Sequence, residues 1–333
     1  MQRRDFLKKT ALMAGVVTMS KTVGCFSDKS LGQKTDSAST NPPGLARRPY
    51  GSTGCDLSII GFGGIVVMNA EQNHANRVVA ESVEKGVNYF DVAPSYGDAE
   101  TKLGPALEPY RKNVFLACKT TERTRAGAAG ELENSLKTLR TDYFDLYQLH
   151  ALTDLEKDVD AAFARGGAME VFIEAKKSGR VRHLGFSAHS VEAALVAMDR
   201  YDFDSILFPV NFATFYRGNF GPRVISRAQQ KGMACLALKA LARQKWPGNA
   251  PLREKYPKCW YQPVTDPVEA EQALRFTLSQ PITAAIPPGE ESLFRLAIDL
   301  AMKFKPLTPE QNDSLKTLAG DLDPIFSAAT PKT

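Results

Sequence analysis

Short apolar runs alternate with amphipathic segments along most of this chain, and this alternation restricts its fold more than any other feature. The runs are rich in β-branched and aromatic residues, as buried parallel strands are. Counting from Ile59 gives eight such runs, each followed by a segment with helical periodicity. Eight strand–helix units over about 250 residues predict an α/β fold of the (β/α)8 TIM-barrel type.

The alternation also gives approximate bounds for each element. Strands are expected at residues 57–64, 87–92, 114–119, 144–150, 181–187, 205–211, 233–238 and 284–287. Helices are expected at residues 70–85, 99–108, 127–139, 170–177, 191–200, 222–231, 267–280 and 290–304, with an extra C-terminal helix at 309–318. Residues 47–58 hold two glycines between short runs and predict an N-terminal β-hairpin. A doubly wound sheet is the competing architecture, but Gly61-Phe-Gly-Gly64 does not have its dinucleotide-turn spacing.

Polar residues suited to catalysis lie at the ends of three successive predicted strands. Asp91 closes one strand, and Tyr96 lies on the loop just beyond it. Lys119 and His150 end the next two strands. The carboxyl ends of parallel barrel strands meet at one mouth, where barrel enzymes place their catalytic residues. Each residue alone has an ordinary structural explanation, but together they predict an active site.

The stretches around these residues resemble the aldo-keto reductase family. They are Tyr89-Phe-Asp-Val-Ala-Pro-Ser-Tyr-Gly97 with Glu100, residues 113–119, residues 135–150 and residues 179–187, within a similarity that runs from about Arg47 to Phe304. The resemblance implies an oxidoreductase that reduces an aldehyde, ketone or sugar carbonyl, or oxidises the corresponding alcohol. The implied cofactor is NADPH, with NADH also open, and no metal is needed. The family's catalytic positions map onto Asp91, Tyr96, Lys119 and His150.

The chemistry explains why these four residue types occur together. Carbonyl reduction adds a hydride to carbon and a proton to oxygen. A tyrosine has an ordinary pKa of about 10, and a nearby lysine ammonium stabilises its phenolate. Lys119 is therefore expected to lower the pKa of Tyr96, Asp91 to keep Lys119 charged, and His150 to orient the substrate oxygen.

The resemblance further implies cofactor contacts. At the nicotinamide end these are Ser187, Asn211, Leu238 and Lys239. Ala188 replaces an asparagine that the family usually has, so one amide contact is missing or is supplied by His189. Leu238 replaces the tyrosine that many members stack on the nicotinamide ring, and Lys239 follows in place of a serine.

At the other end of the cofactor, the loop after the last strand resembles the family's adenosine-phosphate loop. The implied contacts are Pro288, Gly289 and Arg295. Glu290 and Glu291 stand where NADP-preferring members often place basic groups. Two carboxylates repel a 2′-phosphate unless Arg295 pairs with it, so the choice between NADP and NAD stays open.

Two long segments are expected to form walls of the substrate pocket, residues 151–168 and residues 243–266. Long loops at a barrel mouth are more often functional than idle. Trp260 and Tyr261 suit stacking against a sugar or an aromatic ring, and packing of the loop onto the barrel is the alternative.

The first 25 residues have the charged start and short apolar run of a signal peptide, and Arg3-Arg4 with Phe6-Leu7-Lys8 resembles a twin-arginine (Tat) signal. This predicts export by the Tat translocon to the periplasm, or to a membrane if Cys25 is a lipid anchor. A disordered or amphipathic arm is the alternative. Residues 26–46 are expected to be a flexible linker, and residues 47–333 the barrel domain.

Charge and cysteine content exclude other classes. The net charge is +5, but the first 46 residues hold seven Lys/Arg and three Asp/Glu, and the remainder is near neutral. No nucleic-acid footprint is expected. The five cysteines have neither zinc-site spacing nor a CxxC pair, so no disulfide framework is expected. Cys118 and Cys235 lie in apolar runs that predict burial, whereas the polar loop around Cys259 favours exposure.

A second function class remains open from sequence. The altered positions Ala188 and Leu238 suit a nicotinamide-nucleotide-binding sensor or scaffold with vestigial catalysis. Export also raises a supply problem, because little free nucleotide exists outside the cytoplasm. Since Tat transport carries folded proteins, we hypothesise that a cofactor is loaded before export and stays bound.

Overall fold

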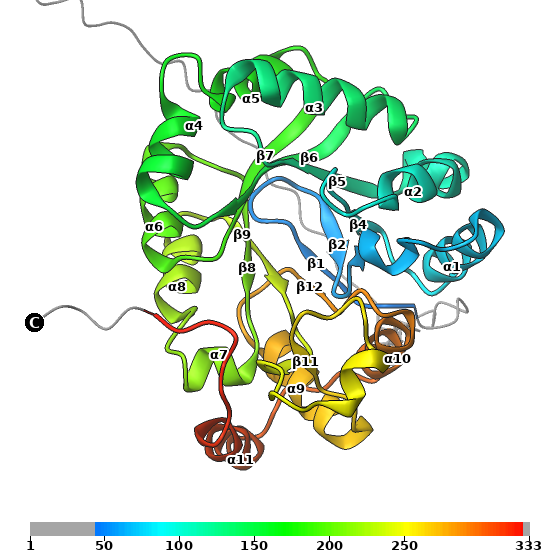
Figure 1. Cartoon of the computed structure of the whole chain (residues 1–333), viewed down its shortest axis with the longest axis vertical. Coiled ribbons are helices and arrows are strands. Elements are labelled where there is room, and N and C mark those ends of the chain that lie inside the picture. The colour runs from blue at the N-terminus through cyan, green and yellow to red at the C-terminus, as the bar shows by residue number, and fades with distance from the viewer. Residues whose placement is uncertain (1–43, 329–333) are drawn as a thin grey trace, which may run out of the picture. The chain divides into compact units, whose positions relative to one another are not determined.

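The structure is a computed structural model that describes residues 44–328. Its centre is an eight-stranded parallel sheet in the order β12–β9–β8–β7–β6–β5–β4–β3. A parallel bridge between Ile60 and Ala285 brings the two edges of the sheet together. The strands therefore form a nearly closed barrel, with helices around the outside (Figure 1). The predicted (β/α)8 barrel is confirmed.

The elements follow the predicted order with small shifts in their bounds. The barrel strands are β3 (Phe62–Gly63), β4 (Tyr89–Asp91), β5 (Phe115–Thr120), β6 (Phe144–Leu152), β7 (Val181–Ala188), β8 (Ser205–Pro209), β9 (Ala234–Leu238) and β12 (Ala284–Ile286). The helices are α1 (Gln72–Glu84), α2 (Ala99–Leu107), α3 (Arg125–Thr138), α4 (Ala161–Phe163), α5 (Ala168–Lys177), α6 (Val191–Arg200), α7 (Phe212–Tyr216), α8 (Pro222–Gln230), α9 (Pro267–Ser279), α10 (Glu291–Ala301) and α11 (Pro309–Gly320). Short helical turns lie at Gly64–Val67, Glu108–Asn113, Leu155–Asp160 and Pro251–Lys255.

The predicted first strand, residues 57–64, is divided between two sheets. Residues Asp56–Ser58 form β2, which pairs antiparallel with β1 (Arg47–Pro49), and only Phe62–Gly63 joins the barrel. The chain turns between them because the Ser58 hydroxyl donates to Ile60 O at 2.7 Å. The apolar run predicted as one strand therefore belongs to two different sheets.

Side chains alternate between the inside of the barrel and the layer beneath the helices, as successive strand residues must. One buried cluster contains Tyr89, Phe115, Leu146, Leu207, Leu236 and Ala284. Their neighbours Phe90, Leu116 and Tyr147 belong to a second buried cluster. Because every second residue of a strand points into the barrel, the inward side chains nearest the mouth include Asp91, Lys119 and Gln148.

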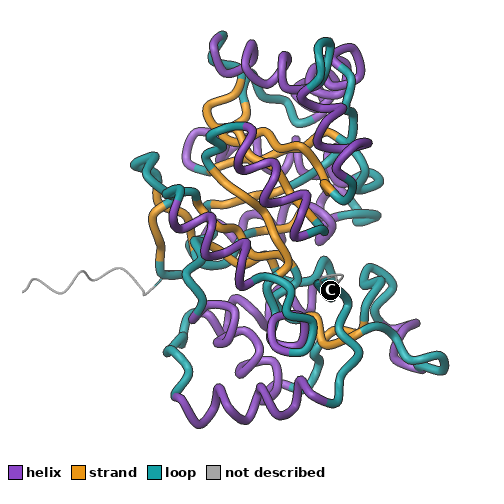
Figure 2. Tube along the Cα trace, turned by 90° about the vertical axis from the view of Figure 1, so that its left-hand side faces the viewer, coloured by secondary structure: helices purple, strands orange, loops and turns teal. Residues whose placement is uncertain are grey.

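The hairpin closes the opposite end of the barrel. Tyr50, just after β1, is fully buried in the inner cluster, and its hydroxyl donates to Ser205 Oγ at 2.7 Å. Arg48 donates to the backbone carbonyls of Leu278 and Ile282. Leu45, which falls in the predicted linker, is also buried. Figure 2 shows the strands enclosed by helices.

Residues 243–266 form a separate layer over the mouth. Their base is a two-stranded antiparallel sheet, β10 (Ala242–Gln244) with β11 (Gln262–Pro263). Cys259 lies in this layer and is 3% exposed, so the expected exposure of this thiol is wrong. Its loop packs Cys259 against Tyr256 and Leu293, a contact that local polarity does not reveal.

The predicted burial of Cys118 and Cys235 is confirmed, and both are free thiols. Among the helices of residues 44–328, none has the length and apolar character that a membrane crossing requires. The predicted signal peptide, Cys25 and most of the predicted linker lie outside the described residues.

Candidate active site

A buried ion pair lies at the mouth of the barrel. Lys119 has no exposed surface and Asp91 is 2% exposed. The Lys119 ammonium donates to Asp91 Oδ1 and, at 3.1 Å, to Val92 O. Burial alone lowers the pKa of Lys119, but Asp91 and Tyr96 raise it, and the net pKa lies above its ordinary value. Lys119 is therefore held in its charged form.

The second oxygen of Asp91 is also occupied. Asp91 Oδ2 accepts hydrogen bonds from the Tyr89 hydroxyl at 3.2 Å and from Gln148 Nε2 at 3.1 Å. Sequence patterns did not single out Tyr89 or Gln148. The available signal was the two-residue period of β6, which places Gln148 on the same face as Leu146 and His150. With both oxygens bonded, the carboxylate is fixed in one orientation.

Tyr96 lies over this pair. The Lys119 ammonium is 4.8 Å from the centroid of the Tyr96 ring. Burial raises the pKa of Tyr96, and the charge of Lys119 opposes that increase without cancelling it. The expected influence of Lys119 is therefore present. The net pKa of the phenol nevertheless lies above its ordinary value, because burial makes the charged phenolate costly. The sequence does not reveal this burial.

His150 faces Tyr96 from β6, on the far side of the strand that carries Lys119. Their rings meet edge to face with centroids 5.7 Å apart, and Ser95 Oγ lies 3.4 Å from His150 Nδ1. The register of β6 against β7 shifts just after His150, where Ala151 has a φ of 55°. Such a bulge changes the direction in which a side chain points.

Burial, followed by the charge of Lys119, lowers the pKa of His150 to about 3. The imidazole is therefore neutral at neutral pH, and it can donate a hydrogen bond without carrying a charge. Arg123, which sequence patterns did not single out, donates to His150 O at 2.6 Å and pairs with Asp158. No local pattern distinguishes Arg123 from a solvated arginine.

Two residues expected to hold a carboxamide lie at the ends of adjacent strands. Asn211 follows β8, is fully buried, and accepts from Thr214 N through Oδ1, while its Nδ2 has no hydrogen-bond partner. Ser187 on β7 accepts from Ala151 N at 2.7 Å, which leaves its hydroxyl proton available. These unused donors fit a group that carries a carbonyl oxygen.

His189, proposed as the substitute for the missing asparagine contact, is also near the mouth. Its ring stacks on Phe326 with centroids 5.0 Å apart, and Nε2 is buried without a partner. Burial and the charge of Lys239 lower the pKa of His189 to about 3. It is therefore a second neutral imidazole with one unused nitrogen.

Leu238 ends β9 and Lys239 follows it, and both line a small cavity of about 90 Å³ together with Asp91 and Tyr96. Lys239 has a φ of 61°, in the left-handed region. Its ammonium lies 5.5 Å from the centroid of the Trp260 ring.

The loop after β12 borders the same cavity through Pro288 and Gly289. A Cβ atom on Gly289 would lie 2.3 Å from a side-chain carbon of Ile65, so only glycine permits this approach. Arg295 is already paired with Glu81 at 2.6 Å and with Glu291 at 2.8 Å. It would have to leave these partners to bind a phosphate.

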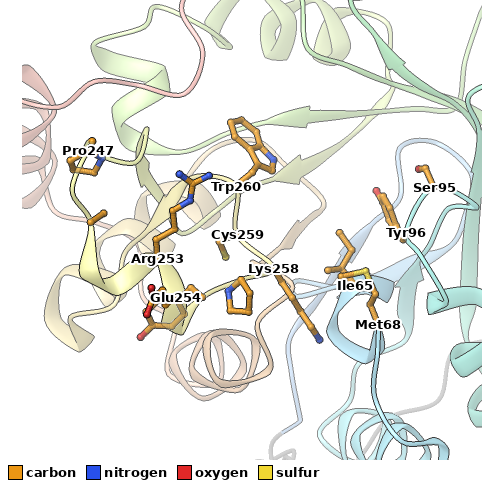
Figure 3. A pocket seen from close by; sticks show the side chains of 14 residues that line it. Ile65, Met68, Ser95, Tyr96, Pro247, Arg253, Glu254, Lys258, Cys259 and Trp260 are labelled. Atoms are coloured by element: carbon orange, nitrogen blue, oxygen red, sulfur yellow. The ribbon is translucent and has the colours of Figure 1, made fainter.

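A larger pocket of about 660 Å³ opens beside Tyr96 and Ser95. Figure 3 shows these two residues on one side and Trp260 with Arg253 on the other. Residues 243–266 thus supply one wall, as expected. None of the residues that line this pocket comes from residues 151–168, so the second expected wall is not found there.

The arrangement combines a phenol that borders a pocket, a fixed cation beneath it and a neutral imidazole beside it. A phenol in this setting can give a proton to a polarised oxygen or take one from an alcohol. Within residues 44–328, no group of three or more His, Cys, Asp or Glu side chains is arranged to hold a metal ion.

Comparison with known proteins places these residues in a family context. A model described as "Aldo/keto reductase family" matches residues 60–258. The oxidoreductase YqkF of Bacillus subtilis (strain 168) is 32% identical over 158 residues, which are 43% of this chain and 49% of that protein. The aldo-keto reductase YhdN of the same organism is 32% identical over 159 residues, 42% of this chain and 46% of that protein.

A plant relative and a solved structure extend the comparison. L-galactose dehydrogenase of Arabidopsis thaliana is 27% identical over 173 residues, 46% of this chain and 51% of that protein. The chain thus spans about half the length of these curated relatives. The holo form of an aldo-keto reductase from Bacillus halodurans is 23% identical with a TM-score of 0.65, covering 84% of this chain and 98% of that one. At this identity the likeness shows the fold.

Proposed function

This chain belongs to the aldo/keto reductase family, and from that premise we propose that it is an NAD(P)(H)-dependent oxidoreductase. It reduces an aldehyde or ketone carbonyl, or oxidises the corresponding alcohol, with Tyr96 as general acid and base. The observation that carries the proposal is the placement of Tyr96 over the buried Lys119–Asp91 pair, at the edge of a pocket.

The residues of the chain supply the proton and the orientation. Tyr96 gives its proton to the carbonyl oxygen, and Lys119 beneath the ring stabilises the phenolate that remains. Asp91 keeps Lys119 charged and in place. His150, neutral at working pH, donates to the same oxygen and aligns it with the phenol. In the oxidative direction the phenolate takes the proton from the alcohol.

Nicotinamide nucleotide, when bound, supplies or accepts the hydride. The unused donors of Asn211 and Ser187 fit its carboxamide, and the unpartnered nitrogen of His189 adds a third polar contact. Leu238 offers an apolar face for the ring. Arg295 is paired with Glu81 and Glu291, and the carboxylate of Glu291 would repel a 2′-phosphate. These features favour NADH over NADPH at the adenosine end, and the proposal includes both cofactors.

The test is oxidation of NADH and NADPH, followed by absorbance, against a panel of aldehydes, ketones and sugars. Tyr96→Phe keeps the ring and removes the proton, so kcat is expected to fall by about 10²- to 10⁴-fold with the fold intact. Equal turnover by wild type and Tyr96→Phe would disprove the role of Tyr96.

The departures at Ala188 and Leu238 favour one alternative, a nucleotide-binding sensor or scaffold with vestigial catalysis. This alternative requires tight binding of NAD(P)(H) in a calorimetric titration and no turnover across the same panel. Rapid turnover of any carbonyl in the panel excludes it.

Export by the Tat route is a further proposal, and it rests on residues 1–25. Changing Arg3 and Arg4 together to lysine is expected to retain the protein in the cytoplasmic fraction, whereas wild type reaches the periplasm or, if Cys25 carries lipid, the membrane. Mass spectrometry of the protein as isolated tests whether a nicotinamide nucleotide stays bound after export.

A further inference from the structure

Lys239 is a cation at the mouth of the barrel that the proposed proton transfer does not use, and the family resemblance implies for it only a cofactor contact. It lines the cavity that contains Asp91 and Tyr96. Its charge is felt by both imidazoles at the mouth, because it lowers the pKa of His150 and of His189. The ammonium therefore lies beside the place where a substrate oxygen meets Tyr96.

The charge of Lys239 is not balanced by the protein. In residues 44–328, Lys239 forms no ion pair with a carboxylate, and no hydrogen bond from its ammonium is present. Its ammonium lies instead 5.5 Å from the centroid of the Trp260 ring. Burial, and then the charge of Lys119, lower the pKa of Lys239 to about 8. The side chain is only partly buried, so its ammonium, which lacks an anionic partner among the described residues, is accessible to a ligand that carries negative charge.

The other two lysines near the cavity have polar partners. Lys119 is bonded to Asp91. Lys258 donates to Val66 O at 2.9 Å, and the carboxylates of Glu290 and Glu291 act to raise its pKa. Lys239 differs from both, because within the described part of the chain its ammonium has no hydrogen bond and no carboxylate acts on its pKa.

The backbone conformation of the loop after β9 fixes the position of Lys239. Its left-handed conformation, with a φ of 61°, is uncommon for a residue other than glycine. Two hydrogen bonds maintain it, from Val210 N to Leu238 O and from Ala242 N to Lys239 O. The chain therefore turns away from the strand direction one residue past β9, at Lys239.

We propose that Lys239 binds a carboxylate of the substrate, so that the preferred substrate is an aldehyde or ketone that also carries an acid group. The proposal rests on the carbonyl chemistry proposed above. The pocket of about 660 Å³ beside Tyr96 gives room for the body of such a molecule. Trp260, 55% exposed and lining both cavities, forms the surface along which that body lies between Tyr96 and Lys239.

The test compares a matched pair of substrates, 4-carboxybenzaldehyde and its neutral methyl ester, in wild type, Lys239→Met and Lys239→Arg. We expect Lys239→Met to lower kcat/KM at least tenfold for the acid and much less for the ester, mainly through KM. Lys239→Arg keeps the charge and is expected to retain most of the preference. Taking the acid-to-ester ratio in each protein cancels the intrinsic reactivity of the two aldehydes.

A binding measurement separates this inference from the proposed reaction. Calorimetric titration with 4-(hydroxymethyl)benzoate and its methyl ester needs no turnover. A preference for the acid that Lys239→Met abolishes supports the inference even if no carbonyl is reduced. Turnover with an unchanged acid-to-ester ratio overturns the inference and leaves the proposed function standing.

The phosphates of the nucleotide are the other anions that could meet Lys239. Fluorescence titration with NADH and NADPH distinguishes them. If Lys239→Met weakens nucleotide binding tenfold while the acid-to-ester ratio is unchanged, Lys239 serves the cofactor and the inference is wrong. Lys258→Met is the matched control, since it removes a lysine of the same cavity and is expected to leave the acid-to-ester ratio unaffected.

Discussion

Lys119 and Lys239 lie at the same mouth of one barrel and have opposite electrostatic surroundings. Lys119 ends its run on β5 inside a regular strand pair and meets Asp91, so its pKa is raised. Lys239 lies one residue past β9 in a left-handed turn and meets an aromatic face, so its pKa is lowered to about 8. The charge of Lys119 is paired with a carboxylate of the protein, whereas the charge of Lys239 is available to a ligand.

The difference shows that residue type and position at a strand end do not fix a role. Burial is the largest influence on each pKa, although Lys119 has no exposed surface and Lys239 is partly exposed. What separates them is a carboxylate on the neighbouring strand. A lysine with that carboxylate can tune a phenol, whereas a lysine without it attracts an anion from outside.

The largest expected effect is at the paired lysine. Lys119→Met leaves Asp91 buried without its cation, which is expected to lower the free energy of unfolding by about 3–5 kcal/mol and to reduce kcat strongly, because Tyr96 loses the charge that stabilises its phenolate. Urea unfolding and steady-state kinetics measure the two effects. The double variant Asp91→Asn/Lys119→Met is expected to recover stability and not activity. A single variant as stable as wild type would contradict the buried pair.

The next effect concerns the two imidazoles that lie between the lysines. His150 and His189 have pKa values of about 3 in the folded protein and about 6.5 when unfolded. Between these values the unfolded state binds more protons, so stability is lost as the pH falls below 6.5, by up to about 2 kcal/mol for each histidine at pH 5. Urea unfolding at pH 5 and pH 7 measures the loss.

His189→Phe, which keeps the stacking on Phe326, is the matched variant for this prediction. It is expected to remove about half of the difference in stability between pH 5 and pH 7. An unchanged difference would mean that His189 is protonated without cost. His189 is influenced by Lys239 and not by Lys119, so Lys239→Met is expected to raise its pKa, as NMR titration would show.

A smaller effect is expected in the pH dependence of substrate binding. With a pKa of about 8, Lys239 is mostly neutral at pH 9, and KM for 4-carboxybenzaldehyde is expected to rise about tenfold between pH 7 and pH 9. The groups that face it are Lys119, His150, His189 and Cys259. The methyl ester serves as the control, and Lys239→Arg is expected to give a KM that does not change over this range.

The smallest effect is on the stability of the unpaired side. Lys239→Met removes a partly buried cation that is paired with no carboxylate of the described residues, so the substitution leaves no unpaired buried charge behind. The free energy of unfolding is therefore expected to rise by less than about 1 kcal/mol. Set beside Lys119→Met, this result in the same urea experiment is the direct measure of the difference between the two lysines. A loss as large as that of Lys119→Met would remove the distinction.

Much of the paired side could be predicted from sequence. The ends of three successive apolar runs placed Asp91, Lys119 and His150 at one mouth, because parallel strands share a direction. The alternation of side chains along β6 placed Gln148 among the inward residues, but no sequence pattern indicated that it bonds to Asp91. The net pKa of Tyr96 also escaped, since the burial of a ring on a loop depends on residues far away in the chain.

The unpaired side was harder to predict because it depends on a turn and on a loop. Lys239 was expected only as a cofactor contact, and no propensity rule places lysine in the left-handed region. The burial of Cys259 and the pairing of Arg295 with Glu81 and Glu291 both arise from segments that meet only in the folded chain. Contacts between distant segments are the part of a structure that periodicity does not encode.

The hairpin that closes the far end of the barrel has a consequence for proton traffic. Tyr50 and Leu57 are 0% and 1% exposed and join the inner cluster, so the barrel interior offers water no passage from that side. In the proposed reaction, the proton of Tyr96 is therefore exchanged with solvent from the side of the mouth, where Tyr96 borders the pocket. Substrate and proton would then share one opening.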